Sequence, residues 1–595
     1  MTDRSETERD NGIARLVDGA ETIAELPAPS DGDETVDGFD EEGCDGPSGG
    51  ETGPDRSVAI AEASRLDHSD TDNGRRLILH FGEDLKVMQR AGIRNTSYVV
   101  WTGSHWDLDG GEDRAFAVAQ EIGALIGLEA DHLAATPMEA KAIAEARTAA
   151  DDLAALEARR SEWTDDEKRR VRDLEATIAA GKAAREALDK RKVARRKFGI
   201  SSKNKARLDA MLACAAPHMT RPPQAWNADP WRFATRTHTI RLGRVVDPEN
   251  PDPDGVRFVG TVEVTPGHRR DDLITFVVPV DFDAEAGCPT WEAFLERFLP
   301  SPAVRRFVQV FSGLGLLGVT VQKFVFHYGD GANGKSVFMQ TLANVFGALG
   351  ANLEPESITG QNQRQGGQAS PDIVKLFGKR FLKVSELPEG VPLQEELIKK
   401  LTGGEEMSAR ALFQGAFDFT PVFSAQMSGN GYPKIEGTNH GIWRRIAVVH
   451  WPVKIPEAEQ REFSEVIDGF RPEYSGILNW LIEGARIWLS EGLVLPDEVR
   501  TATKDYQDDM DPVGPFIADC VTLFPGQSVT AREMYEAYCA WAEANAVFAI
   551  KEAKFGRVMK GRIKRTDERI RRYLDCYLHD VPARPRSPDG ERSGW

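Results

Sequence analysis

The sequence predicts a multidomain α/β protein, and three observations support this fold class. The chain has 595 residues, enough for several domains that each bury a hydrophobic core. Residues 324–328 (FVFHY) are aromatic and β-branched, as in a buried strand, and a glycine-rich stretch follows them. Apolar residues then recur at helical spacing from Val337 to Phe346, and Gly347 is a residue type that commonly ends helices.

The glycine-rich stretch has the spacing Gly329-x-x-x-x-Gly334-Lys335-Ser336, which is typical of a loop that binds nucleotide phosphates. Backbone N–H groups of such a loop and of the following helix point at the phosphates. We expect Lys335 to reach the β- and γ-phosphates and the Ser336 hydroxyl to bind Mg²⁺. The alternative is a glycine-rich turn without a ligand. The predicted site for ATP and Mg²⁺ consists of Gly329, Asp330, Gly331, Ala332, Asn333, Gly334, Lys335, Ser336 and Val337.

A phosphate loop also needs an acidic residue at the end of a neighbouring strand. In KRFLKVSELPEG, residues 381–384 read as that strand, and Glu386 follows it. We expect Glu386 to help hold Mg²⁺ or to polarise the attacking water. The alternative is an ordinary exposed glutamate at a strand end.

Charge is distributed unevenly along the chain, which has a net charge of −20. Residues 1–56 hold 17 acidic and 4 basic residues, a net of −13, and their composition predicts disorder. Residues 551–572 hold 10 basic and 3 acidic residues, a net of +7. Such a run can be a solvated helix face, but in an acidic chain it indicates contact with nucleic acid.

Cysteine spacing and hydropathy exclude several classes of protein. The six cysteines are scattered, with no C-x-x-C pair and no histidine at zinc-binding spacing, so neither a disulfide framework nor a zinc ribbon is expected. The sequence has no signal peptide and no apolar run of about 18 residues. We therefore expect a soluble, intracellular protein without a membrane partner.

The region before the loop reads as several distinct segments. SYVVWTGSHWDLDGG, from Ser97, predicts a β-hairpin that turns at Gly103. Residues 138–198 predict an antiparallel helical hairpin, in which Thr164-x-x-Glu167 starts the second helix with a capping box. Residues 200–290 are mixed, with a proline-rich loop at 247–254 and a strand at 273–280. A helical stretch at 291–319 leads into the phosphate loop.

Further motifs give the chain a resemblance to a known family. GDGANGKS, KVSELPEG, KKLTGGEEMSAR, MSGNGYPKI and GIWRRI occur in the order and spacing of the phage and plasmid primase-helicases, which are related to the poxvirus primase-helicase. The resemblance covers about residues 76–580 outside the helical hairpin. It implies a superfamily 3 helicase ATPase with an AAA+-like P-loop core, an N-terminal α+β accessory domain and a C-terminal winged-helix module.

The resemblance also implies roles for individual residues. Asn430 falls where the family has a polar sensor of the γ-phosphate, and Arg444 and Arg445 fall in its arginine-finger segment. Because adjacent residues of an extended segment point in opposite directions, we expect one arginine to anchor within its own subunit and the other, Arg445 first, to reach a neighbour. The candidate DNA-binding residues are Lys399, Lys400, Arg410, Lys560, Arg562, Lys564 and Arg565.

This chain departs from the family near its DNA-contacting hairpin. Glu405 stands where the family usually has an aspartate, and Gln414-Gly415 stand where it often has a lysine. The predicted domains are an acidic disordered tail (1–75), an accessory domain (76–290) with the hairpin inserted at 138–198, an ATPase domain (291–500) and a winged-helix module (505–595).

Together these features predict a cytoplasmic ATP-dependent DNA helicase for phage, prophage or plasmid replication, in a bacterial or phage-infected cell. The resemblance implies a hexameric ring, 3′-to-5′ movement, single-stranded and forked DNA as partners, and a separate primase or other replication proteins. One alternative is an ATP-switched origin loader without processive unwinding. Another is a bifunctional primase-helicase that uses Asp281-x-Asp283 to bind a metal ion, and a small-molecule kinase fits the basic C-terminal segment poorly.

Overall fold

The computed structural model describes residues 54–89, 97–108, 110–158, 160, 163–247, 256–360, 370–410, 416–435 and 440–582. The predictions of disorder for residues 1–53, of a loop at 248–254 and of a hairpin tip at Gln414-Gly415 lie outside these residues. The chain divides into two compact units, residues 1–228 with 267–276, and residues 229–266 with 277–595.

The first unit contains a four-stranded sheet with helices packed against it. The strand order is β3-β2-β1-β4, and the predicted hairpin is present because β2 pairs antiparallel with β3, with Trp101 opposite Trp106. The strands are β1 (Leu85–Met88), β2 (Ser97–Trp101), β3 (Trp106–Asp107) and β4 (Thr220–Arg221). The helices are α2 (Pro54–Ala63), α3 (Asp70–Phe81), α4 (Gly111–Glu129), η3 (Ala130–His132), α5 (Pro137–Glu157), α6 (Asp165–Ser202) and α7 (Lys205–Met219), with a short η5 (Pro223–Ala225) after β4.

The predicted boundary of the acidic tail at residue 75 is wrong. Helix α2 lies before residue 75 and α3 spans it, and Ile60 and Ala63 of α2 are buried. Ser69 caps α3 by accepting a hydrogen bond from the backbone N–H of Asp72 at 3.1 Å. Acidic residues dominate this stretch in composition, but the apolar positions of α2 and the cap of α3 bring it into the folded unit.

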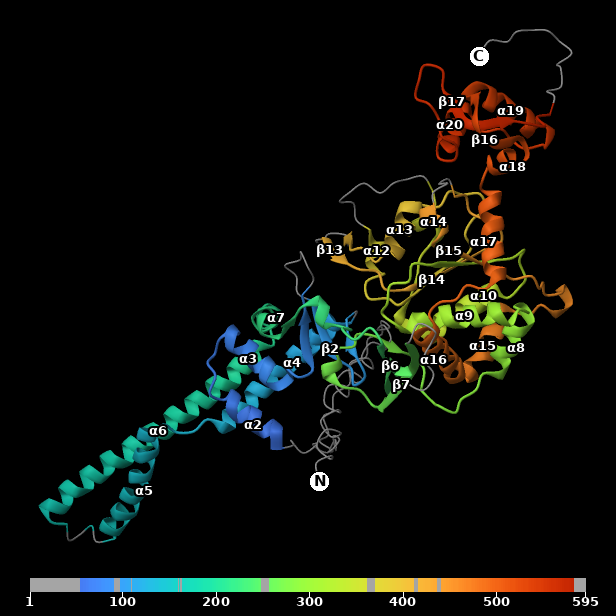
Figure 1. Cartoon of the computed structure of the whole chain (residues 1–595). Helices are drawn as coiled ribbons and strands as arrows, with labels where there is room; N and C mark the ends of the chain where they lie inside the picture. Colours follow the sequence, from blue (N-terminus) through green and yellow to red (C-terminus); the bar gives the residue numbers. More distant parts are fainter. Residues whose placement is uncertain are drawn as a thin grey trace, which may run out of the picture. The chain divides into compact units, whose positions relative to one another are not determined.

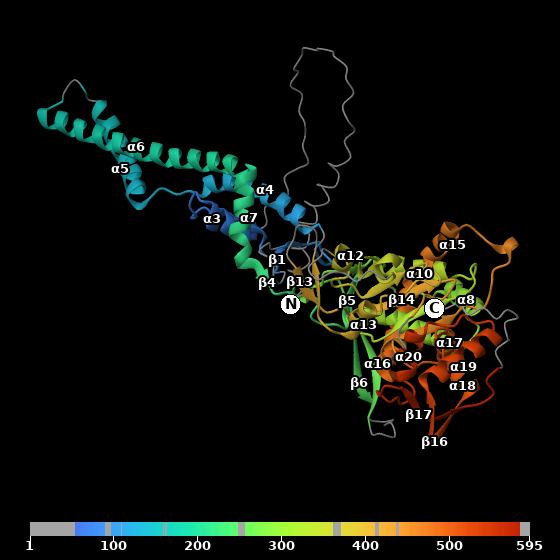
Figure 2. The same ribbon diagram turned by 90° about the horizontal axis from the view of Figure 1, so that it is seen from above.

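The predicted helical hairpin is confirmed and consists of α5 and α6, which run side by side (Figures 1 and 2). Each helix begins with a capping box, formed by Thr136 with Glu139 and by Thr164 with Glu167. The side chain of Arg191 on α6 donates two hydrogen bonds of 2.6 Å to the carboxylate of Glu139 on α5. This bidentate pair ties the later part of α6 to the beginning of α5.

The second unit begins with a four-stranded sheet of order β7-β6-β5-β8, formed by β5 (Arg232–Thr235), β6 (His238–Asp247), β7 (Arg257–Pro266) and β8 (Val277–Val278). The strand predicted at 273–280 is reduced to two residues, because the preceding segment, which belongs to the first unit, forms η6 (Arg270–Asp272) and then takes a left-handed turn at Leu273, with φ of 47°. The domain boundary predicted at 290 is also wrong. The backbone N–H of Gly260 donates to Ser490 Oγ at 2.7 Å, and Arg380 Nη1 donates to the Arg232 carbonyl at 2.8 Å, so this sheet packs with the following domain.

A five-stranded parallel sheet forms the centre of the second unit, with order β10-β11-β14-β9-β15. Its strands are β9 (Phe324–Tyr328), β10 (Gly350–Asn352), β11 (Phe381–Val384), β14 (Ser424–Gly429) and β15 (Ile446–His450). A separate antiparallel pair is formed by β12 (Met407–Arg410) and β13 (Ala416–Phe419). The surrounding helices are α8 (Pro289–Phe298), α9 (Pro302–Gly313), η7 (Leu314–Leu316), α10 (Lys335–Phe346), η8 (Gly347–Leu349), α11 (Pro355–Ile358), α12 (Pro371–Val374), α13 (Glu395–Gly403), α14 (His440–Trp443), η9 (Glu457–Glu459), α15 (Phe463–Phe470), η10 (Arg471–Glu473), α16 (Tyr474–Glu491) and α17 (Asp497–Asp509).

Helix α17 packs against β15 of this sheet (Figure 1). The backbone N–H of Val448 donates to Thr503 Oγ1 at 2.9 Å, and the hydroxyl of the buried Tyr506 donates to the Pro433 carbonyl. The predicted boundary between residues 500 and 505 therefore falls inside a helix that belongs to the parallel sheet. The C-terminal module begins after it.

The C-terminal module has its own hydrophobic core, which starts at Val513. Its elements are α18 (Gly514–Cys520), β16 (Val521–Thr530), α19 (Ala531–Ala544), α20 (Glu552–Lys560) and β17 (Arg572–Leu578), and β16 pairs antiparallel with β17. The sequence also predicts that Met534, Tyr535, Tyr538 and Trp541 share one core face of a helix. Met534, Tyr538 and Trp541 are buried on α19, whereas Tyr535 is partly buried and packs against the same core. Among all the described residues, no helix is both long enough and apolar enough to cross a membrane.

Candidate functional site

The glycine-rich loop lies between β9, which ends at Tyr328, and α10, which begins at Lys335, as the sequence predicts. Two glycines are required there for different reasons. A Cβ atom on Gly329 would lie 2.1 Å from Asn333 Nδ2, and Gly334 has φ of +81° with the ring of Phe294 3.0 Å from the position of a Cβ. The neighbouring side chains therefore leave no room for a side chain at Gly329 or Gly334. With glycine at both positions, the loop backbone can approach a ligand closely.

Lys335 is the first residue of α10, and its side chain is buried with an exposed fraction of 4%. Its ammonium group donates to the carbonyl of Gly329 at 2.7 Å and to Asn333 Oδ1 at 2.6 Å. Burial lowers the pKa of Lys335 from 10.5 to about 8, and the nearby carboxylate of Asp330 opposes this shift. A cation held inside a loop of backbone N–H groups is suited to bind an anionic group such as a phosphate.

A series of buried hydrogen bonds holds the side chain of Asn333 in place. Asn333 Nδ2 donates to the Trp451 carbonyl at 3.2 Å, and Trp451 Nε1 donates to His327 Nδ1 at 3.0 Å. His327 Nε2 then lies 2.9 Å from Gln426 Oε1, and Gln426 Nε2 donates to Ser312 Oγ at 3.0 Å. Since the indole N–H can only donate, His327 carries its proton on Nε2. Burial lowers the pKa of His327 to about 4, so the ring is neutral.

Three further predicted residues lie at the carboxyl ends of the parallel strands. Ser336 is exposed in the first turn of α10, Glu386 is exposed two residues after β11, and Asn430 is exposed directly after β14. Asn430 Nδ2 lies 3.9 Å from the position of a Cβ on Gly331, so Asn430 is next to the glycine-rich loop. Open parallel sheets bind their ligands outside the carboxyl ends of their strands.

Glu386 has an unusual backbone conformation, with φ of +60°. Its backbone N–H lies 3.5 Å from Ser428 Oγ, and the following N–H, of Leu387, donates to the Ser428 carbonyl at 2.8 Å. Left-handed backbone at a residue other than glycine costs on the order of 1 kcal/mol and is frequent at functional sites. The end of β14 thus holds Glu386 in a strained turn with its carboxylate exposed.

The structure separates the roles that Arg444 and Arg445 can have. Arg445 is buried, and it donates through Nε to Thr402 Oγ1 at 3.1 Å and through Nη1 to the Gly441 carbonyl at 2.7 Å. Burial and the neighbouring Arg444 lower the pKa of Arg445. Arg444 is exposed beside a cavity of about 320 Å³ that Lys323 also lines. Arg445 therefore anchors within its own chain, and the projecting arginine is Arg444, the reverse of the expectation from the sequence.

The predicted DNA-binding residues differ in exposure and in pairing. Lys399 forms an ion pair of 3.0 Å with Glu396, whereas Lys400 and Arg410 are exposed on α13 and β12. Arg562 forms an ion pair of 2.7 Å with Asp511, and Lys560 lies 3.9 Å from Asp567.

The remaining two cations of the C-terminal module are also unlike each other. Arg565 is partly buried and donates to the Gly556 carbonyl at 3.4 Å. Lys564 is exposed and forms no ion pair within the described part of the chain. Lys564 thus differs from Lys560 and Arg562, which are also exposed but each lie near a carboxylate.

Sequence reasoning missed an aromatic stack beside the loop. The rings of Tyr328 and Tyr432 stack at 4.3 Å, Tyr432 stacks on Tyr506 at 4.2 Å, and His450 stacks on Tyr328 at 5.6 Å. Burial raises the pKa of Tyr432 to about 12. The sequence shows only that Tyr328 and His450 are aromatic residues at the ends of strands. The stacking of rings from separate segments depends on the order of the strands in the sheet, which the sequence does not show.

The residues of the loop fit a nucleotide with Mg²⁺. Mg²⁺ in such sites takes one or two protein ligands, and phosphate oxygens and water supply the others, so an exposed hydroxyl at Ser336 and a carboxylate at Glu386 are a suitable donor set. Within the described residues, no group of three or more His, Cys, Asp or Glu side chains could hold a metal ion by itself. The carbonyls of Asp281 and Asp283 accept hydrogen bonds from Ser475 and Asn479 of α16, which gives this segment a structural role.

Comparisons with known proteins find sequence similarity between this chain and viral proteins that are named putative helicases. Residues 74–300 match the family described as "D5 N terminal like". The chain is 24% identical over 279 residues to "Putative helicase L207/L206" of Acanthamoeba polyphaga mimivirus and 24% identical over 289 residues to "Putative helicase 022R" of Frog virus 3 (isolate Goorha). These alignments cover 44% and 45% of this chain. The chain spans only 29% of each of these relatives.

Solved structures are more distant. The apo structure of the NrS-1 C terminal region in its A form matches 57% of this chain and 70% of that chain, with 10% identity and a TM-score of 0.32. A likeness at this TM-score does not support an argument about function. Residues 74–300 of this chain thus match a family model described as D5 N terminal like, and less than half of the chain is similar in sequence to viral proteins whose names are putative helicases.

Proposed function

We propose that this protein is an ATP-dependent DNA helicase that acts in the replication of a phage, prophage or plasmid. The observation that carries the proposal is the buried Lys335 in a glycine-rich loop at the carboxyl end of a parallel sheet. Ser336, Glu386 and Asn430 at the same edge of the sheet support it, as do the relatives named as helicases.

Each residue of the site then has a distinct task. Lys335 and the backbone N–H groups of the loop bind the phosphates, while Asn333 orients the ammonium group. Ser336 and Glu386 hold Mg²⁺, and Glu386 also orients the attacking water through its carboxylate. Asn430 contacts the γ-phosphate from the end of β14. Bound ATP with Mg²⁺ supplies the phosphoryl transfer whose free energy drives movement along DNA.

We further propose that the active form is a hexameric ring in which subunits complete one another's sites. Arg444 is exposed and can reach a neighbouring subunit, whereas the buried Arg445 holds the segment in place through Thr402 and Gly441. A planar, permanently charged guanidinium is suited to stabilise the charge that develops on the transferred phosphoryl group.

DNA contacts in this proposal come from two places in the second unit. Arg410 lies on β12 and Lys400 on α13, the helix that precedes this strand, and Lys564 is exposed on the C-terminal module. The module has a helix, a strand, two helices and a strand, an order compatible with a winged helix. Single-stranded and forked DNA are the proposed partners.

The test is ATP hydrolysis and strand displacement on duplexes that carry a single-stranded tail of either polarity. A helicase should hydrolyse ATP faster in the presence of single-stranded DNA and should displace the annealed strand from one type of tail. Hydrolysis without displacement on either substrate would favour an ATP-switched loader instead. Absence of ATP hydrolysis under all these conditions would contradict both functions.

A further inference from the structure

The second half of α6 presents a basic face that neither the ATP site nor the C-terminal module explains. Residues 182–203, which are the second half of α6 and its C-cap, contain nine basic and two acidic residues, a net of +7, in a chain whose net charge is −20. The first half of the same helix, residues 165–181, is nearly balanced, with four basic and five acidic residues. The positive charge is thus concentrated in one segment of the hairpin.

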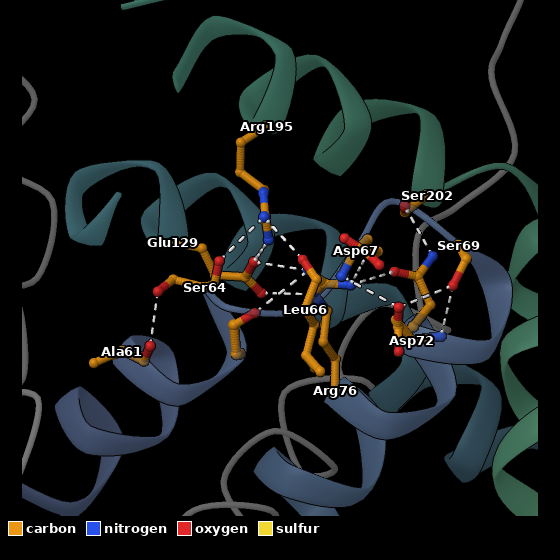
Figure 3. A network of polar contacts seen from close by, with 12 residues as sticks. Ala61, Ser64, Leu66, Asp67, Ser69, Asp72, Arg76, Glu129, Arg195 and Ser202 are labelled. Atoms are coloured by element: carbon orange, nitrogen blue, oxygen red, sulfur yellow. Dashed lines mark hydrogen bonds and ion pairs between the residues drawn. The ribbon is translucent and has the colours of Figure 1, made fainter. Parts of the chain in front are cut away.

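The inner side of this segment is fixed by a buried cluster of charges (Figure 3). Arg76 Nε donates to the carboxylate of Glu129 at 2.7 Å, and Arg195 of α6 donates to the same carboxylate. Arg195 Nη2 also donates to the carbonyls of Leu66 at 2.9 Å and Ser64 at 3.1 Å. All three charged side chains are buried, and together they hold the C-terminal part of α6 against α3, α4 and the segment between α2 and α3.

The outer side carries the cations that these contacts leave exposed. None of the following forms an ion pair with any residue that the structure describes: Lys182, Arg185, Lys190, Lys197 and Lys203. At 100° per residue, Lys182, Lys190 and Lys197 lie on the side of α6 opposite Arg195, and the other two lie on its flanks. Arg196 is also exposed but pairs with Asp131 at 2.7 Å, and Glu186 and Asp189 are the acidic residues on this face.

We propose that this face binds the phosphate backbone of duplex DNA. From Lys182 to Lys203 it extends about 30 Å along the helix, which matches about nine base pairs of a duplex. Surfaces that bind single strands present aromatic rings on which bases stack. The large apolar side chains exposed here are Val193 and Ile200, whereas Phe198 is buried under His68. A rigid row of cations without exposed rings fits the regular phosphates of a duplex.

The proposal concerns a surface separate from the ATP site, so it is tested without nucleotide. A fluorescent duplex of about 20 base pairs is titrated with the full chain at several salt concentrations, and a single strand of the same length is titrated in parallel. The test variant is Lys190→Gln/Lys197→Gln/Lys203→Gln. The matched control is Lys168→Gln/Arg169→Gln/Arg170→Gln, which neutralises three cations of the same helix that already pair with Asp165, Asp166 and Asp152.

The test variant should bind the duplex at least about tenfold more weakly at ~0.15 M salt, with a salt slope smaller by about two to three units, because each phosphate that is no longer neutralised removes about 0.9 unit. The control should bind like the unchanged protein, and both variants should keep the helical circular dichroism signal. Equal duplex binding by the test variant and the control would overturn the proposal, as would a reduction confined to the single strand. The alternative to duplex DNA as the occupant of this basic face is the segment of residues 1–53, which has a net charge of −13. Equal duplex binding together with carboxyl–lysine crosslinks from these residues to Lys197 would assign the face to them instead.

Discussion

The ammonium group of Lys335 donates a hydrogen bond of 2.6 Å to the side-chain carbonyl of Asn333, two residues before it in the same loop. Asn333 is in turn held by the carbonyl of Trp451, which follows β15. The position of the lysine therefore depends on a strand more than a hundred residues further along the chain. This relationship makes Asn333 a positioning residue for the proposed phosphate site.

The first prediction concerns Asn333. Asn333→Ala removes a hydrogen bond to a charged group, which contributes on the order of 1.5–3 kcal/mol, so kcat/KM for ATP should fall about 10- to 100-fold. The loop should stay folded because Gly329 still accepts from Lys335. The control is Asn344→Ala in the following helix, whose side chain donates to the Tyr474 hydroxyl, away from the loop. Steady-state kinetics that are equal for both variants would contradict the positioning role.

The second prediction is a pH dependence of nucleotide affinity. Because the pKa of Lys335 is about 8, the ammonium group loses its charge as the pH rises above that value, and ATP should bind progressively more weakly. The free energy of unfolding should instead increase as the pH rises. The unfolded chain holds this proton up to a pKa of about 10.5, so the folded state gains stability between about pH 8 and 10.5.

Equilibrium titration with a fluorescent ATP analogue between about pH 7 and 10 measures this effect. Lys335→Met should bind weakly and at nearly the same affinity throughout the range, since it has no proton to lose at this position. A wild-type affinity that stays constant up to about pH 10 would show that Lys335 does not bind the phosphates.

The local elements of the site could be predicted from the sequence, and its long-range contacts could not. The strand β9, the loop and the helix α10 follow from neighbouring residues, and Glu386 follows from its place after an apolar strand. The support from Trp451 and His327 depends on β15 and β14 pairing with β9 on its two sides. No periodicity in the sequence encodes that pairing.

The expected roles of the two arginines and the expected boundary at residue 75 differ from the structure for similar physical reasons. Arg445 and Arg444 have the same side chain, and the positions of Thr402 on α13 and of the Gly441 carbonyl give Arg445 its buried partners. The acidic composition before residue 75 concealed α2 and α3, whose few apolar residues are enough to fix them against the first unit. Composition averages over a window, whereas burial is decided at single positions.

The third prediction separates the two arginines. Arg444→Ala should leave the fold and ATP binding intact but reduce turnover on the order of a thousandfold, as expected for an arginine finger supplied by a neighbour. Arg445→Ala should instead lower the free energy of unfolding by about 1–3 kcal/mol, because the Thr402 hydroxyl and the Gly441 carbonyl each then lose the hydrogen bond that Arg445 donates.

Mixing experiments distinguish action within a subunit from action on a neighbour. Arg444→Ala protein mixed with Lys335→Ala protein should regain part of its hydrolysis, since some interfaces then combine an intact loop with an intact arginine. No recovery, with subunit exchange demonstrated by fluorescence energy transfer, would sink the shared-site arrangement.

The fourth prediction concerns the C-terminal module. Removal of residues 511–595 should weaken DNA binding and lower its salt slope by about one unit for each phosphate that the module binds, while basal ATP hydrolysis persists. The truncation starts at 511 because α17 ends at Asp509 and packs on the parallel sheet. Lys564→Gln is the matched point change, and Lys383→Gln, a partly buried lysine on β11, is its control. An unchanged salt slope after truncation would mean that the basic segment is only a solvated surface.

The central claim is that the loop around Lys335 binds ATP and that its hydrolysis drives strand separation. The most direct test measures ATP hydrolysis and strand displacement together, on one tailed duplex, for the unchanged protein and for Lys335→Ala. The account predicts that both activities are present in the unchanged protein and that both are absent from the variant, which keeps the same circular dichroism spectrum. Strand displacement by a folded Lys335→Ala protein at the unchanged rate would contradict it.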